Sequence, residues 1–171
     1  MTAEPPRVPA RAPPGVPPRA PPRESPADLD PVLAEMRETL FAEFGALAIY
    51  GHLARSRADP ELAALLETFR DEEREQIERL RDLLGRLGRR APSRRLRRRI
   101  VPWMLACAAR CGFRELALRS CLWSEETVSR WYLHHAVRLG IAGLLDAART
   151  CEELSSTKQR HALALQAWVR S

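Results

Sequence analysis

The stretch LFAEFGALAIYGHLA, residues 40–54, holds the most informative pattern in the chain. Glu43 is its only acidic residue, and it contains no lysine or arginine. A carboxylate in such surroundings has to be hydrogen-bonded, ion-paired or metal-bound once it is buried. Large side chains recur here at steps of three and four residues, which predicts a helix with one buried face. The side chains in this pattern are Leu33, Met36, Leu40, Phe41, Phe44, Leu47 and Tyr50.

Start and stop signals predict four long helices. Asp30-Pro31 and Asp59-Pro60 each combine an N-cap residue with a proline at the first helical position, and glycines follow two of the periodic segments. The expected ranges are about 31–57, 60–87, 113–139 (closed by Gly140) and 143–169, with a short apolar helix at about 101–111. We therefore expect an all-α, antiparallel four-helix bundle with a short apolar helix between its second and third long helices.

The first 29 residues differ in composition from the rest of the chain. Eleven of the 14 prolines lie at or before Pro31, and large apolar side chains are almost absent there. Because such a segment buries too little surface to offset the cost of ordering, we expect residues 1–29 to form a disordered Pro/Ala/Arg-rich tail. The folded bundle is expected to span residues 30–171. A spacer is the favoured role for the tail, and a proline-motif ligand is the alternative.

The formal charge of +6 comes from one short segment. Residues 86–99 contain eight arginines and no acid, which leaves −2 for the remainder of the chain. An apolar segment with Trp103 follows, so the Arg94–Trp103 region is expected to contact an anionic membrane surface, with a solvated linker as the alternative. Nucleic acid is a weaker explanation because no aromatic residues are interleaved with the arginines. With no membrane-spanning stretch and no secretory signal after Met1, we expect a cytoplasmic protein or one bound peripherally to a membrane.

A carboxylate and a phenol recur together on two of the expected helices. Glu43 precedes Tyr50 by seven residues, and Glu125 precedes Tyr132 by the same distance. Seven residues turn a helix by about 700°, so both members of each pair lie on one face. The two glutamates are 82 residues apart.

A second pair of matching motifs lies on the other two long helices. Glu73-x-x-Gln76 is followed 85 residues later by Lys158-x-x-His161. The chain therefore resembles one helical hairpin used twice. Bundles with a dinuclear carboxylate site place one glutamate on each of two helices and Glu-x-x-His on each of the other two. This sequence has that framework with two substitutions.

The segment EFGALAIYG, residues 43–51, resembles the first-helix motif of the demethoxyubiquinone hydroxylase family, a di-iron branch of the ferritin-like superfamily. Glu125-Glu126 with Trp131-Tyr132 is similar to the third-helix motif of that family. Ile100-Val-Pro102-Trp103 is similar to its apolar segment after the second helix. The resemblance covers roughly residues 35–168. It implies a ferritin-like bundle, an iron cofactor and O2-dependent hydroxylation of a membrane-dissolved, quinone-like substrate.

The resemblance also implies six metal-ligand positions. In this sequence they are Glu43, Glu73, Gln76, Glu125, Lys158 and His161. Gln76 stands where a histidine would bind the first metal, and Lys158, the only lysine in the chain, stands where a glutamate would bridge both metals. Tyr132 is the candidate catalytic residue, next to the ligands.

The two substitutions change the charge that the site offers. Three glutamates give −3 and a protonated Lys158 gives +1, so two divalent ions would leave an uncompensated +2, which is costly in a buried site. One divalent ion would leave the site neutral. We therefore expect a mononuclear or metal-free site with a Glu43–Lys158–Glu73 salt bridge. In the mononuclear form Glu73, Glu125 and His161 would bind iron, with manganese or zinc as alternatives.

Two functions are compatible with these residues. The favoured one is a metal-poor accessory protein, a non-oxygenase descendant of the di-iron fold, for which a homodimer is one partner that the sequence permits. The alternative is an iron-dependent monooxygenase or other oxidoreductase acting on a quinone-like substrate at the membrane surface. Lys158 could instead reach solvent, with the glutamates satisfied by tyrosines and His161. His134 and His135 are expected at the surface or beside the ligands.

Overall fold

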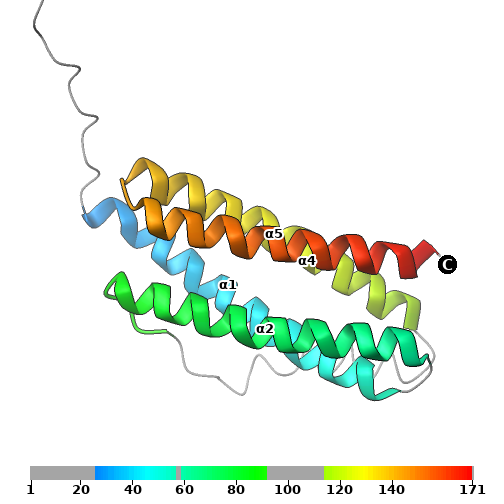
Figure 1. The fold of residues 1–171 in the computed structure, drawn as a ribbon. Coiled ribbons are helices and arrows are strands. Elements are labelled where there is room, and N and C mark those ends of the chain that lie inside the picture. Colours follow the sequence, from blue (N-terminus) through cyan, green and yellow to red (C-terminus); the bar gives the residue numbers. More distant parts are fainter. Residues whose placement is uncertain (1–25, 57–58, 92–113, 171) are drawn as a thin grey trace, which may run out of the picture.

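The computed structural model describes residues 26–56, 59–91 and 114–170. This part of the chain is all-helical, and the all-α prediction is confirmed. The elements are α1 (Pro26–Leu53), the short 3₁₀ helix η1 (Ala54–Ser56), α2 (Pro60–Arg86), α4 (Arg114–Ile141) and α5 (Leu145–Arg170). The long helices form a bundle in which α1 pairs with α2 and α4 pairs with α5 (Figure 1). The two helices of each pair are close together in the sequence and run in opposite directions.

Some predicted features lie outside the described residues. They are residues 1–25 of the expected tail, the short apolar helix at 101–111 and the Arg94–Trp103 segment. None of the helices in the described ranges combines the length and the apolar character needed to cross a bilayer.

Helix α1 begins at Pro26, and Pro31 lies inside it. The predicted helix start at Asp30-Pro31 is therefore wrong. Ser25-Pro26 offers the same kind of start signal earlier in the sequence. A proline in the second turn removes only one backbone hydrogen bond, and the extension lets Leu29 pack against the apolar core.

Helix α2 begins where the sequence predicted. The Asp59 carboxylate accepts hydrogen bonds from the backbone N–H groups of Glu61, at 3.0 Å, and Leu62, at 3.1 Å. These bonds satisfy two of the donors that a helix N-terminus leaves free. The helix ends before Gly88, whose φ of 74° requires a residue without a Cβ.

Helix α4 runs past Gly140, the predicted stop. The residue that turns the chain is Gly143, with a φ of 79°. Its N–H donates to the carbonyl of Gly140 at 3.0 Å, and the N–H of Leu144 donates to the carbonyl of Leu139 at 2.9 Å. This pair of bonds is the Schellman closure of a helix C-terminus, so Gly143 and not Gly140 ends α4.

The interior of the bundle has a polar layer between two apolar clusters. One cluster combines the first halves of α1 and α5 with the second halves of α2 and α4. The other cluster combines the opposite halves. The polar layer between them consists of Glu43, Glu73, Gln76, Glu125, Lys158 and His161. Apolar burial at both ends therefore holds these polar side chains at one level of the bundle.

Two glycine substitutions test how α4 ends. Gly140→Ala should raise the free energy of unfolding by about 0.5–1 kcal/mol, because alanine is the better helix former. A Cβ at this position meets only the Cβ of Ala148, at 3.9 Å. Gly143→Ala should lower the free energy of unfolding by about 1 kcal/mol, because alanine is strained at a positive φ. Urea unfolding checks both variants, and the reverse order of stabilities would contradict the assignment.

Candidate functional site

The polar layer brings together all six predicted ligand positions. Four different helices supply them: α1 gives Glu43, α2 gives Glu73 and Gln76, α4 gives Glu125, and α5 gives Lys158 and His161. Every one of these side chains is buried, and Gln76 is the most exposed at 3%. The alternative in which Lys158 reaches solvent is therefore wrong.

Lys158 is the centre of the polar layer. Its Nζ lies 2.5 Å from Oε2 of Glu43, contacts Oε1 of Glu73 and lies 3.5 Å from Oε2 of Glu125. Carboxylates from three helices thus surround one ammonium group from the fourth. This arrangement contains the Glu43–Lys158–Glu73 bridge that the charge count predicted.

The two tyrosines of the repeated pattern donate to each other's glutamates. The Tyr50 hydroxyl on α1 donates to Oε1 of Glu125 on α4 at 2.6 Å. The Tyr132 hydroxyl on α4 donates to Oε1 of Glu43 on α1, also at 2.6 Å. Each glutamate therefore has one oxygen bonded to a phenol and the other directed toward Lys158. Tyr132, the candidate catalytic residue, acts here as a donor that fixes Glu43.

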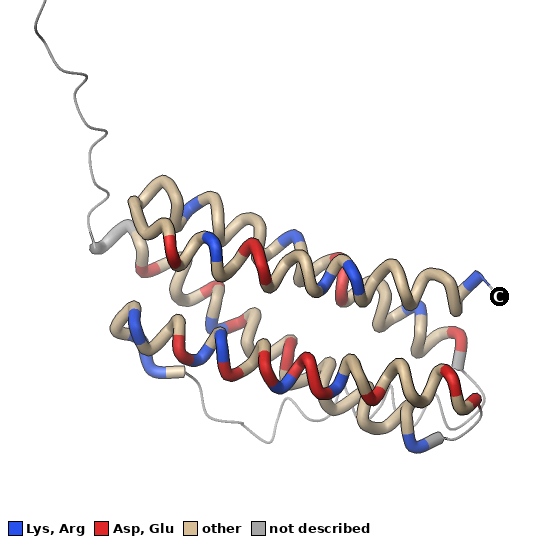
Figure 2. Tube along the Cα trace, in the orientation of Figure 1, with Lys and Arg blue, Asp and Glu red and all other residues tan. Residues whose placement is uncertain are grey.

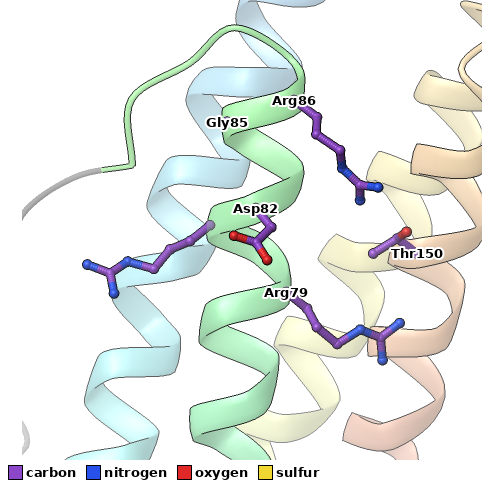
Figure 3. A pocket seen from close by; sticks show the side chains of 6 residues that line it. Arg79, Asp82, Gly85, Arg86 and Thr150 are labelled. Carbon is purple, nitrogen blue, oxygen red and sulfur yellow. The ribbon is translucent and has the colours of Figure 1, made fainter.

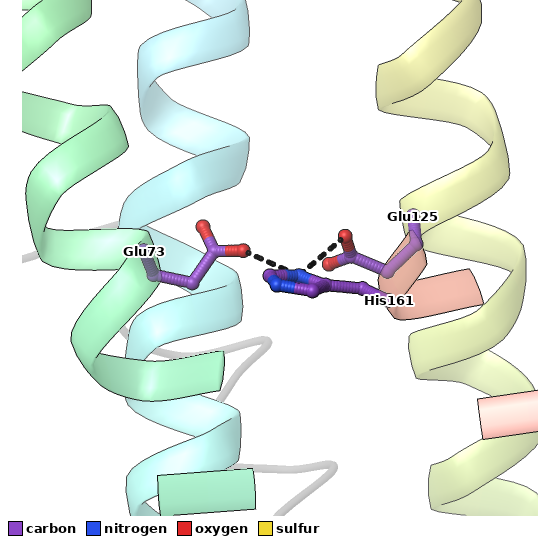
Figure 4. Close-up of side chains that lie close together, drawn as sticks. All are labelled: Glu73, Glu125 and His161. Atoms are coloured by element: carbon purple, nitrogen blue, oxygen red, sulfur yellow. Dashed lines mark ion pairs between the residues drawn. The ribbon is translucent and has the colours of Figure 1, made fainter. Parts of the chain in front are cut away.

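His161 projects between the carboxylates of Glu73 and Glu125 (Figure 4). Its Nδ1 lies 3.5 Å from Oε1 of Glu73 and 3.3 Å from Oε2 of Glu125. On the other side of the ring, Nε2 lies 2.6 Å from Oε2 of Glu72. Phe69 stacks on the imidazole with ring centroids 4.0 Å apart. The sequence interpretation missed Glu72 and Phe69, although both lie within one helical turn before Glu73.

Burial and charge shift the pKa values in this layer in opposite directions. Burial, and then the charge of Glu73, raise the pKa of Glu43 well above its usual range, against the effect of Lys158. Burial acts to raise the pKa of Glu73 as well, but Lys158 and His161 outweigh it and lower that pKa to about 2. Burial acts to lower the pKa of Lys158, but Glu125 and the other two carboxylates raise it. The ammonium therefore stays charged, and Glu73 remains ionised beside it.

One ion could be held by part of this layer. Ligand atoms of Glu73, Glu125 and His161 all lie within 4.8 Å of one another. Hydrogen bonds from His161 to Glu125 and Glu73 outweigh burial and raise the pKa of the imidazole to about 9. A metal would therefore have to displace a proton from His161 before binding there.

His135 is buried, whereas His134 beside it is exposed. A surface position is therefore wrong for His135, which has an edge-to-face ring contact with Tyr132 at 6.5 Å between centroids. Its Nε2 lies 3.1 Å from the hydroxyl of Thr39, which donates to the carbonyl of Glu35. Burial, followed by the charges of His134 and Arg138, lowers the pKa of His135 to about 4.

A groove of about 710 Å³ lies on the outside of the bundle, away from the predicted ligands. It is lined by Arg79, Arg81, Asp82, Gly85, Arg86 and Thr150. Figure 3 shows Arg79 and Arg86 of α2 reaching toward the α5 side, where Thr150 lies. Arg79 is ion-paired with Glu153, and the Thr150 hydroxyl donates to the carbonyl of Asp146. Because these side chains already have partners, the groove is an open surface that carries charges of both signs.

Removing the ammonium tests its role in stability. Lys158→Met should lower the free energy of unfolding by about 3–5 kcal/mol at pH 7, because it leaves buried carboxylates without their main cation. The loss should be smaller at pH 5, where the carboxylates take up protons more easily. Arg160→Met is the matched control on α5, because Arg160 is exposed and lies 3.4 Å from Glu72. Equal losses in the two variants would show that the ammonium is not needed.

The buried histidine predicts a loss of stability in mild acid. Its pKa falls from 6.5 to about 4 on folding, so the unfolded chain binds more protons between these values. The free energy of unfolding should therefore decrease from pH 6.5 to pH 4, with His135 contributing on the order of 3 kcal/mol. His135→Gln keeps a donor for Thr39 without titrating, so urea unfolding should show a shallower pH dependence. The control His134→Gln should change the slope much less than His135→Gln, because it removes one of the charges that lower the pKa of His135 and leaves the burial that is the main cause. Identical slopes in all three proteins would contradict the assignment.

Comparison of the chain with models of protein families, with curated proteins and with solved structures gave no match. We therefore base the functional proposal on the residues of the polar layer.

Proposed function

We propose that this chain is a ferritin-like protein in which a lysine has taken the place of the metals of a di-iron site. In this proposal it serves as a metal-free accessory or interaction protein and not as an oxygenase. The position of Lys158 carries the proposal. Its Nζ contacts Glu43 and Glu73 and lies 3.5 Å from Glu125, so it compensates the carboxylates that would otherwise neutralise metal ions.

The order and direction of the helices support the ferritin-like part of the proposal. In Figure 1, α1 and α5 run in one direction, and α2 and α4 run in the other. The connections from α1 to α2 and from α4 to α5 are short in the sequence, and the one from α2 to α4 is long. Ferritin-like bundles have one such long crossover. The exchanged tyrosine–glutamate bonds agree with two related hairpins and with the resemblance to the demethoxyubiquinone hydroxylases.

The donor set does not suit two divalent ions. A protonated lysine has three hydrogens to donate and no lone pair for a metal. Gln76 offers a neutral amide where the resemblance expects an imidazole, and neither of its polar atoms has a hydrogen-bond partner in the described part of the chain. Two divalent ions would also leave the layer with the uncompensated +2 calculated above.

One observation favours a second candidate, a mononuclear metal site. Two carboxylates and one imidazole, from Glu73, Glu125 and His161, lie close enough to share an ion. Such a set suits Fe(II), Mn(II) or Zn(II), and iron there would supply the oxidoreductase chemistry that the resemblance implies. The ion would have to displace a proton from His161 and compete with Lys158 for Glu73. These two costs place the metal-free function first.

Metal analysis tests the proposal. Wild type purified from iron-supplemented cells should contain well under one iron per chain. Lys158→Glu combined with Gln76→His should bind close to two Fe(II) or Mn(II) ions, because it restores a fourth carboxylate and the missing imidazole. Without metal this double variant should be less stable than wild type, since four buried carboxylates repel each other. Added metal should recover the loss by mass action.

A second double variant is the matched control. Lys158→Gln with Gln76→His restores the imidazole without the fourth carboxylate, so it should bind at most one ion. Near two irons in wild type would support the oxygenase and contradict the proposal. One equivalent in wild type, lost in Glu125→Gln, would favour the mononuclear site. A Lys158→Glu, Gln76→His protein that binds no metal and stays as stable as wild type would show that these positions do not form a metal site.

A further inference from the structure

Helix α4 exposes large apolar side chains on the face turned away from the bundle. They are Leu116, Trp123, Leu133, Val137 and Ile141, and Trp123 is 66% exposed. Charged residues are sparser along α4 than along α2 (Figure 2). The opposite face of α4 is buried against the core, so the helix is apolar on two sides. A helix of this kind is normally covered on both sides.

The outward positions of α4 follow a heptad spacing. One series has a period of seven, and a second series of the same period lies three residues further along, as the a and d positions of a coiled coil do. The a series is Leu116, Trp123, Arg130 and Val137, and the d series is Arg119, Glu126, Leu133 and Gly140. We call these eight residues the α4 seam. Because seven residues turn the helix by about 700°, the seam stays on one face along roughly 40 Å of helix.

We propose that the α4 seam pairs with the α4 seam of a second copy of this chain, antiparallel, with the twofold axis beside residue 128. In an antiparallel coiled coil an a position faces a d position of the partner helix. This register sets Trp123 against the partner's Leu133, and Leu116 against the partner's Gly140, beside Ile141. It also sets Val137 against the partner's Arg119. Each of these contacts forms twice, as a twofold interface requires.

The charges at the centre of the seam select this register. Arg130 donates only to the Thr127 hydroxyl, at 3.2 Å, and Glu126 has no ion-pair partner among the described residues. The antiparallel register sets Arg130 against the partner's Glu126 on both sides of the axis. A parallel pairing would set Arg130 against Arg130 and Glu126 against Glu126. A shift by one heptad would set Arg130 against Arg119 in one direction and against Leu133 in the other.

Arg119, the remaining charge in the seam, is already compensated within its own chain. Its guanidinium is ion-paired with Glu115 at 2.6 Å. The aliphatic part of an arginine covers apolar surface while its head group stays in water, so it can lie along Val137 of the second copy. A lipid surface fits the seam less well, because it would bury the central Glu126 and Arg130 without the opposite charges that a second copy supplies to each of them.

Charge reversal distinguishes a seam that pairs with a second copy from a helix that is only exposed. Wild type should sediment as a dimer over a range of concentrations. Glu126→Arg alone and Arg130→Glu alone should each raise the dimer dissociation constant tenfold or more, because each places like charges at the axis. An equimolar mixture of the two variants should dimerise again, because every Arg–Arg or Glu–Glu contact becomes an Arg–Glu contact in the mixed pair. Circular dichroism melts confirm that both variants remain folded.

An apolar pair of variants supplies the matched control. Trp123→Glu lies on the seam and should give a monomer, whereas Leu163→Glu, at a 68% exposed position on α5, should leave the dimer intact. A wild-type chain that stays monomeric at every concentration would overturn the proposal. So would a dimer that tolerates both charge reversals, a mixture that associates no better than its components, or a monomeric wild type that Trp123→Glu makes less stable. The last result would mean that the chain itself covers the seam.

Discussion

One ammonium group and three carboxyl groups share a buried layer of the bundle. Taking these charges out of water is costly, and only their mutual contacts and hydrogen bonds offset the cost. Because Lys158 comes from α5 and its partners come from α1, α2 and α4, the contacts can form in one alignment of the four helices. A shift of any helix by one turn, about 5.4 Å, would place a charge against an apolar cluster. The layer therefore fixes the register of the helices as well as the chemistry of the site.

The way in which the two hairpins, α1 with α2 and α4 with α5, pack against each other depends on the same layer. Within each hairpin the helices pack closely, through apolar residues above and below the charges. Between the hairpins, the exchanged bonds from Tyr50 to Glu125 and from Tyr132 to Glu43 join α1 to α4. Lys158 joins α5 to the other hairpin through Glu43 and Glu73. Directional polar bonds thus specify how one hairpin lies on the other, a role that apolar packing alone leaves less defined.

The sequence was most informative at Glu43. This residue stood alone in an apolar stretch, which required a hydrogen bond, an ion pair or a metal once it was buried, and in the structure Lys158 and Tyr132 supply the first two. The sequence was ambiguous where the same helix start or stop signal occurred twice. Ser25-Pro26 and Asp30-Pro31 both read as a helix start, and only the backbone φ separates Gly143 from Gly140. Periodicity predicts which face of a helix is buried but not which helix packs against that face. The contacts of His135 with Thr39 and of His161 with Glu72 could therefore not be predicted.

The exposed α4 seam, on the outside of the bundle, shows the same limit of prediction from periodicity. Its heptad spacing is visible in the sequence, but the spacing gains meaning only once the opposite face of α4 is known to be buried. Helix α4 then shows two apolar faces, one packed in the core and one exposed.

The covalent attachment of the central cation has a physiological consequence. A metal stabilises a fold only to the extent that the cell supplies it, because its contribution rises and falls with the free ion concentration. The Lys158 ammonium is delivered with every copy of the chain and cannot be chelated, oxidised or exchanged for another ion. In the metal-free form that we propose, the bundle would keep the same fold in iron-starved and iron-replete cells and would draw nothing from the iron pool.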